Sequence, residues 1–259
     1  MSDEEYSDQF VAGLEWIWGE GFLSPGGPAE VAEILDGVEL NGKKGLDIGC
    51  GLGGIDLLLV ADYGADFVQG IDVEAPLIER AAIAASRAGL TSQLDFKLVT
   101  PGALPFRDDE FDFVFSKDSM IHIPDKPACY QEIRRVLKPS GQLVFSDWFG
   151  SADPMTDAMT RWLEVVGLTF ELGTMGQAVD ILSSLGFDAV EARDRNHWYR
   201  QYMDEELATL SGEHYTKLVS EIGKDAAAQR LESSSLKKTV VEQGQLRPGH
   251  IRARLQEIG

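Results

Sequence analysis

The chain has 259 residues, of which 44% are hydrophobic, and a formal net charge of −20. Phosphate binding needs clustered Lys and Arg, so this charge argues against a nucleic-acid partner. The sequence has no apolar run of the ~18 residues that span a bilayer, and its acidic start is unlike a signal or transit peptide, so we expect a cytoplasmic protein without a membrane span.

The predicted elements begin with a helix at 5–18. Over 44–148, β-rich runs alternate with helical patterns, which predicts a parallel sheet with crossover helices. Strands are expected at 44–49, 67–72, 94–99, 111–116 and 141–148, and helices at about 53–62, 76–88 and 126–137. Later helices are expected at 153–167, 175–186 and over most of 200–243, with strands at 187–195 and 250–258.

These elements predict a single domain over 1–259. Its core is expected at about 28–150 and 174–195, with a final strand at about 250–257. Its lid is expected from 1–27, 151–173 and 198–245. The two cysteines, Cys50 and Cys129, are too few and too far apart for a metal site or a disulfide framework, so we expect no metal.

A glycine-rich run, LDIGCGLGG at 46–54, follows the first predicted strand and opens a helix. Gly49, Gly51 and Gly53 let the backbone turn sharply and approach a ligand closely. Asp47 lies in the strand end, and Asp72 ends the next strand about twenty residues on, where an acid can accept both hydroxyls of a ribose. A nicotinamide or flavin site and a plain structural turn are the alternatives to the interpretation that follows.

The run resembles motif I of class I S-adenosylmethionine (SAM) methyltransferases. With YSDQFVAGLEWIWGEGFLSPGG at 6–27 and SKDSMIHI at 116–123, the chain resembles phosphoethanolamine N-methyltransferases and related small-amine methyltransferases of the sarcosine and dimethylglycine type. The resemblance implies a Rossmann-like α/β fold of the class I methyltransferases, with a mostly parallel seven-stranded sheet, helices on both faces and a helical lid. It also implies SAM as the cofactor and S-adenosyl-L-homocysteine as its product.

The resemblance also implies roles for individual residues. Tyr6 and His122 match an active-site pair, and Asp118 matches the acid that faces the substrate amine. Trp148 and Lys237 are the further substrate-binding positions. The cofactor-binding positions that it implies are Ser24, Asp47, Gly49, Gly51, Gly53, Asp72, Val73, Thr100 and Ser116.

Some positions depart from the family pattern. Thr100 stands where the family usually has Asp, and Trp148 stands where a phosphate-contacting tyrosine is expected. The run EVVGLTFEL at 164–172 lacks the Arg and Tyr that hold phosphate in those enzymes. Since an arginine fork is the strongest donor for a phosphate, a phosphate ester is a doubtful substrate.

Asp118 and His122 lie four residues apart at the end of the fourth predicted strand, where ligands bind in open parallel sheets. An alternative makes them a helix N-cap and a core histidine. As functional residues, Asp118 attracts the substrate ammonium, while Tyr6 and His122 lock the lid and accept the departing proton. Trp148 is the preferred member of an aromatic ammonium cage, with core packing as the alternative.

We therefore expect an enzyme, a SAM-dependent methyltransferase of the EC 2.1.1 type. Its acceptor is expected to be the nitrogen of a small amine or amino acid, either an aminoalcohol or a compound of the glycine, sarcosine or dimethylglycine type. The alternatives are methylation of sulfur or oxygen on a small metabolite and, in another class, a catalytically silent SAM-binding sensor or partner subunit. A monomer or weak homodimer is expected.

Overall fold

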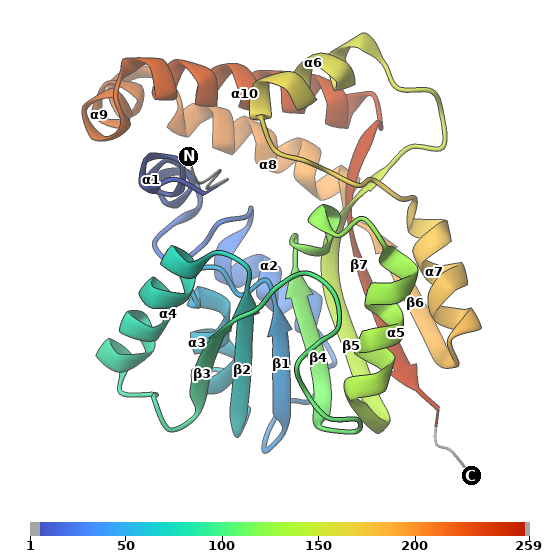
Figure 1. Ribbon diagram of the computed structural model, residues 1–259. Coiled ribbons are helices and arrows are strands. Elements are labelled where there is room, and N and C mark those ends of the chain that lie inside the picture. Colours follow the sequence, from blue (N-terminus) through green and yellow to red (C-terminus); the bar gives the residue numbers. More distant parts are fainter. Residues whose placement is uncertain (1–5, 257–259) are drawn as a thin grey trace.

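The computed structural model describes residues 6–256, which form one seven-stranded sheet with helices around it (Figure 1). The strand order is β3-β2-β1-β4-β5-β7-β6. Strands β1 to β5 pair in parallel, and β7 runs antiparallel to both β5 and β6. The strands are β1 Lys44–Ile48, β2 Phe67–Asp72, β3 Leu94–Leu98, β4 Phe111–Lys117, β5 Leu137–Gly150, β6 Phe187–Asp194 and β7 Leu246–Leu255. The mostly parallel seven-stranded sheet expected from the sequence is confirmed.

Helices cover both faces of the sheet because successive strand residues point to opposite faces. In β4, Val114 belongs to one apolar cluster, and its neighbours Phe113 and Phe115 belong to another. The Val114 cluster is completed by helices α5 Lys126–Val136 and α7 Met175–Ser184. The cluster on the other face is completed by α2 Gly27–Leu35, α3 Gly54–Ala61 and α4 Ala75–Ala88.

A second group of helices lies beyond the carboxyl ends of the parallel strands (Figure 1). It comprises α1 Asp8–Trp18, α6 Asp157–Val166, α8 Asn196–Thr209, α9 Gly212–Ile222 and α10 Lys224–Glu242. Helix α10 packs against α6, α8 and α9, and Trp162, Tyr199 and Val240 meet in one apolar cluster. These helices fall in the segments assigned to the lid, although the division of the chain into core and lid remains a prediction.

Several boundaries differ from those expected. Helix α2 was not predicted, although Pro28 in its first turn is a common helix-start signal. Strand β7 begins at Leu246 rather than at residue 250, because Leu246–Gly249 continue the antiparallel pairing with β5. Helix α1 begins at Asp8, with the Ser7 hydroxyl accepting a hydrogen bond from Phe10 N at 3.3 Å. Residue 5 of the predicted first helix and residues 257 and 258 of the predicted last strand lie outside the described residues.

Within residues 6–256, no helix is both long enough and apolar enough to span a membrane.

Candidate active site

The loop between β1 and α3 turns tightly through its glycines. Gly49, Gly51 and Gly53 have φ values of +76°, +54° and +78°. A Cβ atom on Gly49 would lie 1.7 Å from Ser119 Oγ, so no other residue fits there. Gly49 N and Cys50 N both donate to Ile71 O, at 2.8 and 3.0 Å, which fixes the loop against the end of β2. The result is a backbone-lined cradle at the carboxyl edge of the sheet.

Asp72, at the end of β2, lies beside this cradle. Its carboxylate accepts hydrogen bonds from Gly51 N at 2.9 Å and from Glu74 N at 3.0 Å. Burial raises the pKa of Asp72, and these backbone donors oppose the rise. A carboxylate has about four acceptor positions and Val73 N is a third backbone donor, so Asp72 can still accept from a ligand hydroxyl. The next residue, Val73, is 53% exposed, and Thr100 beyond β3 is also exposed.

Residues 21–25 lie over the glycine loop. A Cβ atom on Gly51 would meet the Leu23 side chain at 3.1 Å, and one on Gly54 would lie 2.4 Å from the carbonyl oxygen of Gly21. Leu23 also packs against the cluster of Leu52 and Leu77. The segment that leads from α1 to α2 therefore covers the cradle.

A pair of buried acids lies beneath the loop. Asp47 in β1 is 1% exposed, and Asp56 in the first turn of α3 is fully buried. Burial raises the pKa of both, to about 7 for Asp56, and repulsion by Asp56 raises the pKa of Asp47 further. Their four carboxyl oxygens meet no hydrogen-bond donor in residues 6–256, so the contact between the two acids needs a proton on one of them. Asp47 thus lies under the loop, and its part in cofactor binding remains a prediction.

The end of β4 carries a buried ion pair. The Lys117 side chain, 1% exposed, donates to Asp118 Oδ2 at 2.8 Å, to Ser24 Oγ at 2.6 Å and to Pro25 O at 2.9 Å. Asp118 has a positive φ of +55°, and its second oxygen accepts a hydrogen bond from Ser146 Oγ at 2.5 Å. The carboxylate expected to hold a substrate ammonium is therefore already paired with a cation of the protein. Sequence reasoning missed Lys117.

Ser116, the residue before this pair, is fully buried. Its hydroxyl donates to Ile48 O at 2.8 Å, which joins the ends of β4 and β1. A cofactor contact by Ser116 remains a prediction.

A cavity of about 90 Å³ lies between these strand ends and the helices above them. It brings together residues that are far apart in the sequence, from α1, the ends of β4 and β5, and α10. Six of the predicted site residues line it, namely Tyr6, Ser24, Asp118, His122, Trp148 and Lys237. The predicted cofactor residues of the glycine loop and of β2 lie outside its lining. We call this cavity the catalytic pocket.

His122 ends the short 3-10 turn η1, Met120–His122, and lines the catalytic pocket. Its Nδ1 lies 2.8 Å from Thr169 O. A carbonyl oxygen can only accept, so Nδ1 carries a hydrogen and the neutral ring has its lone pair on Nε2. Tyr6 lines the same pocket, and its ring packs edge-on against Phe10 at 5.6 Å. A direct Tyr6–His122 pair remains a prediction.

Trp148 and Lys237 line the pocket with other partners. Trp148 packs edge-on against Tyr199, with ring centroids 4.8 Å apart. Lys237 Nζ lies 3.0 Å from Glu206 Oε1, and burial lowers the pKa of Lys237 while Glu206 opposes the fall. The lysine predicted to bind substrate is thus paired with a carboxylate of the protein.

Arg230 is a second residue of this site that sequence reasoning missed. It lines the catalytic pocket, lies 4.5 Å over the Phe10 ring and reaches Phe10 O at 3.4 Å. It makes no ion pair within residues 6–256, and burial lowers its pKa to about 10. Positions 230, 233, 234 and 237 share one face of α10 and all line the pocket, but the sequence does not show which face of this helix points inward.

The described part of the chain contains no group of three or more His, Cys, Asp or Glu side chains arranged to hold a metal ion.

Residues 39–200 match a family described as a methyltransferase domain. Phosphoethanolamine N-methyltransferase 3 of Arabidopsis thaliana is 29% identical over 226 residues, covering 87% of this chain and 45% of that protein. The phosphoethanolamine N-methyltransferase of Plasmodium falciparum is 29% identical over 226 residues, covering 85% of this chain and 83% of that protein. The chain therefore spans about half the length of the plant relatives that it matches. The resemblance stated from the sequence is confirmed.

Solved structures share the fold. Phosphoethanolamine N-methyltransferase 2 of Haemonchus contortus, in complex with phosphomonomethylethanolamine and S-adenosylhomocysteine, has a TM-score of 0.91 at 21% identity, covering 98% of this chain and 59% of that chain. A candidate sarcosine dimethylglycine methyltransferase of Galdieria sulphuraria has a TM-score of 0.76 at 23% identity, covering 96% of this chain and 87% of that chain. At these identities the likeness confirms the class I methyltransferase fold.

Proposed function

The chain belongs to the methyltransferase domain family, and from that premise we propose that it is a SAM-dependent N-methyltransferase of a small amine. The observation that carries the proposal is the catalytic pocket, which combines Asp118, His122 and Trp148 at the carboxyl ends of β4 and β5. Open α/β sheets bind their ligands at this edge. A pocket of about 90 Å³ suits a small acceptor rather than a macromolecule.

We place the cofactor in the glycine cradle, and the residues there fit it. The positive-φ turn at Gly49, Gly51 and Gly53 shapes the cradle, and Asp72 retains an acceptor position for a ribose hydroxyl. Val73 offers exposed apolar surface for a purine. Lys117 fixes the Ser24 hydroxyl by a hydrogen bond. When bound, SAM supplies an electrophilic methyl group. The chain's own task is to present a neutral, aligned amine to it.

The amine has to lose a proton first. An alkyl ammonium with a pKa near 10.4 is only about 0.04% neutral at pH 7. Removing its proton to give the nucleophilic amine therefore costs about 4.6 kcal/mol. His122, with hydrogen on Nδ1 and a lone pair on Nε2, is the proposed base. Asp118, whose charge Lys117 offsets, is proposed to accept a hydrogen bond from the amine and so orient its lone pair. Alignment and removal of water then supply most of the acceleration.

Arg230 narrows the proposed acceptor to an amine that carries an anionic group. A half-buried guanidinium without a carboxylate in ion-pair contact is costly, and a bound carboxylate or phosphate would pair with it. This revises the expectation from EVVGLTFEL, because an arginine from α10 replaces the one that segment lacks. An amino acid and a phosphorylated aminoalcohol both satisfy this requirement, whereas plain ethanolamine does not.

The test is transfer of a labelled methyl group from SAM to ethanolamine, phosphoethanolamine, glycine, sarcosine, dimethylglycine and a panel of thiols. We expect transfer to at least one anionic amine, and we expect Arg230→Gln to raise KM for that amine at least tenfold with a smaller effect on kcat. The matched control is Arg247→Gln, since Arg247 lies outside the pocket and pairs with Asp194 at the surface. Transfer to thiols alone contradicts N-methylation. SAM binding without transfer to any acceptor favours the silent sensor.

A further inference from the structure

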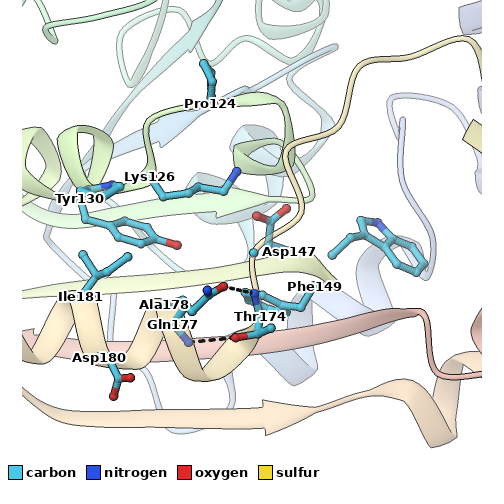
Figure 2. Close-up of a pocket in the computed structure, with 13 residues that line it drawn as sticks. Pro124, Lys126, Tyr130, Asp147, Phe149, Thr174, Gln177, Ala178, Asp180 and Ile181 are labelled. Carbon is cyan, nitrogen blue, oxygen red and sulfur yellow. Dashed lines mark hydrogen bonds between the residues drawn. The ribbon is translucent and has the colours of Figure 1, made fainter. Parts of the chain in front are cut away.

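A second cavity, of about 350 Å³, lies between α5, the end of β5 and α7 (Figure 2). Its volume falls within the roughly 300–1,000 Å³ of small-molecule sites. Trp148 lines both this cavity and the catalytic pocket, so the two are neighbours. None of the roles proposed above uses it.

Charged and polar side chains meet in this cavity. Asp147 and Tyr130 are each 1% exposed, and in Figure 2 the Tyr130 hydroxyl, the Asp147 carboxylate and the Lys126 ammonium point into the same space. The Tyr130 hydroxyl makes no hydrogen bond to any other group in residues 6–256. Lys126 and Asp147 form no direct ion pair within that range. The Lys126 ammonium, the Asp147 carboxylate and the Tyr130 hydroxyl thus lie around an open volume, whose lining also includes Thr174 and the exposed Asp180.

The two charged groups also hold η1, which carries His122. Lys126 Nζ donates to Met120 O and, at 2.9 Å, to Ile123 O. Asp147 Oδ1 accepts from Ile121 N at 3.1 Å. On the opposite side, Ile121 O accepts from Glu171 N at 2.8 Å. Lys126 and Asp147 of the second cavity therefore support η1, whose Ile121 and His122 line the catalytic pocket.

The charges in the cavity select the class of ligand. A simple anion is repelled by Asp147, and a simple cation is repelled by Lys126, whereas a molecule with both charges satisfies the two at once. The rings of Trp148 and Phe149 add an apolar face that favours a substituted ammonium. Burial raises the pKa of Asp147 to about 7 and lowers that of Lys126. A ligand group of opposite charge would therefore stabilise the charged form of each.

We propose that this cavity is a regulatory site for a small zwitterion, an amino acid or its N-methylated form. The ligand carboxylate meets Lys126 and the Tyr130 hydroxyl, and its ammonium meets Asp147. Binding draws Lys126 and Asp147 away from η1, which loosens the support of His122 and lowers turnover. The effect on turnover rests on the proposed methyltransferase function, but the binding itself does not.

The test uses trimethylglycine as the probe, because its quaternary nitrogen has no lone pair and cannot accept a methyl group. Calorimetric titration should show binding that weakens about tenfold in Tyr130→Phe, which removes only the hydroxyl. Ala178→Leu, which fills the cavity from α7, should abolish it. Both variants should keep the SAM-induced shift in melting temperature and, without the probe, the wild-type turnover.

The control is Arg230→Gln, which alters the catalytic pocket only: it should weaken any trimethylglycine that binds there as a reaction product and leave binding at the second cavity unchanged. Binding that survives both Tyr130→Phe and Ala178→Leu, or is lost in Arg230→Gln, places the probe elsewhere and overturns the proposal. Absence of binding to the wild-type protein also overturns it. Failure of the methyltransferase proposal is seen separately, as absence of labelled transfer in reactions without trimethylglycine.

Discussion

Replacing Lys117 by methionine tests whether the buried ion pair at the end of β4 depends on its cation. The change keeps the length of the side chain but removes the ammonium that pairs with Asp118 and holds Ser24 and Pro25. The Asp118 side chain is only 6% exposed, so it would become a buried carboxylate without its counter-ion. Removing one partner of a buried pair costs about 3–5 kcal/mol. In a chain of this size that lowers the melting temperature by about 6–20 °C.

The assay is thermal and urea denaturation of Lys117→Met, Asp118→Asn and the double variant. Asp118→Asn removes the stranded charge, so the double variant should be more stable than Lys117→Met alone. The matched control is Lys138→Met, since Lys138 also lies 2.8 Å from its partner, Asp112, but both side chains are partly exposed. That pair should contribute only about 0.2–1 kcal/mol. A Lys117→Met loss no larger than that of Lys138→Met, or losses that simply add in the double variant, would refute the reasoning.

SAM should raise the melting temperature of the protein, and NAD should not. Asp72→Ala should remove most of the shift that SAM causes. A full shift in that variant would place the cofactor elsewhere. His122→Ala should lower turnover about a hundredfold with SAM binding retained, and Tyr6→Phe should imitate it with little further loss in the double variant; additive losses contradict a joint role. Asp56 has its pKa raised from 3.8 to about 7, so the stability that its neutral form contributes is complete below pH 3.8 and is lost as pH rises through 7. Asp56→Asn should therefore stabilise the protein at pH 8 more than at pH 5, and equal effects on urea unfolding at both pH values contradict the shared proton.

The sheet could be predicted because its strands are short apolar runs, and the glycine loop because its spacing follows a strand. The burial of Lys117 could not be predicted, since a lysine at the end of a buried strand normally reaches solvent. Its burial depends on Ser24 and Pro25, which are 93 and 92 positions away in the sequence. Arg230 lies on a helix whose pocket-facing side is decided only by packing of α10 against α6 and α8.

The second cavity was also beyond sequence reasoning. Asp147, Tyr130 and Ala178 come from β5, α5 and α7, and their meeting depends on how both helices pack on one face of the sheet. Helix α2 was missed for a different reason. Its helical pattern is only nine residues long, and Glu30 in its first turn is buried in a pair with Arg195, 165 positions away in the sequence.

The segment over the glycine loop determines how a bound cofactor is exchanged. Gly21 and Leu23 cover the cradle, and Lys117 pins the following residues by two hydrogen bonds. We expect a cofactor bound beneath this segment to leave only when these contacts break, so that its residence time follows the opening rate of the segment. An enzyme built in this way is expected to be limited in each cycle by departure of the demethylated product.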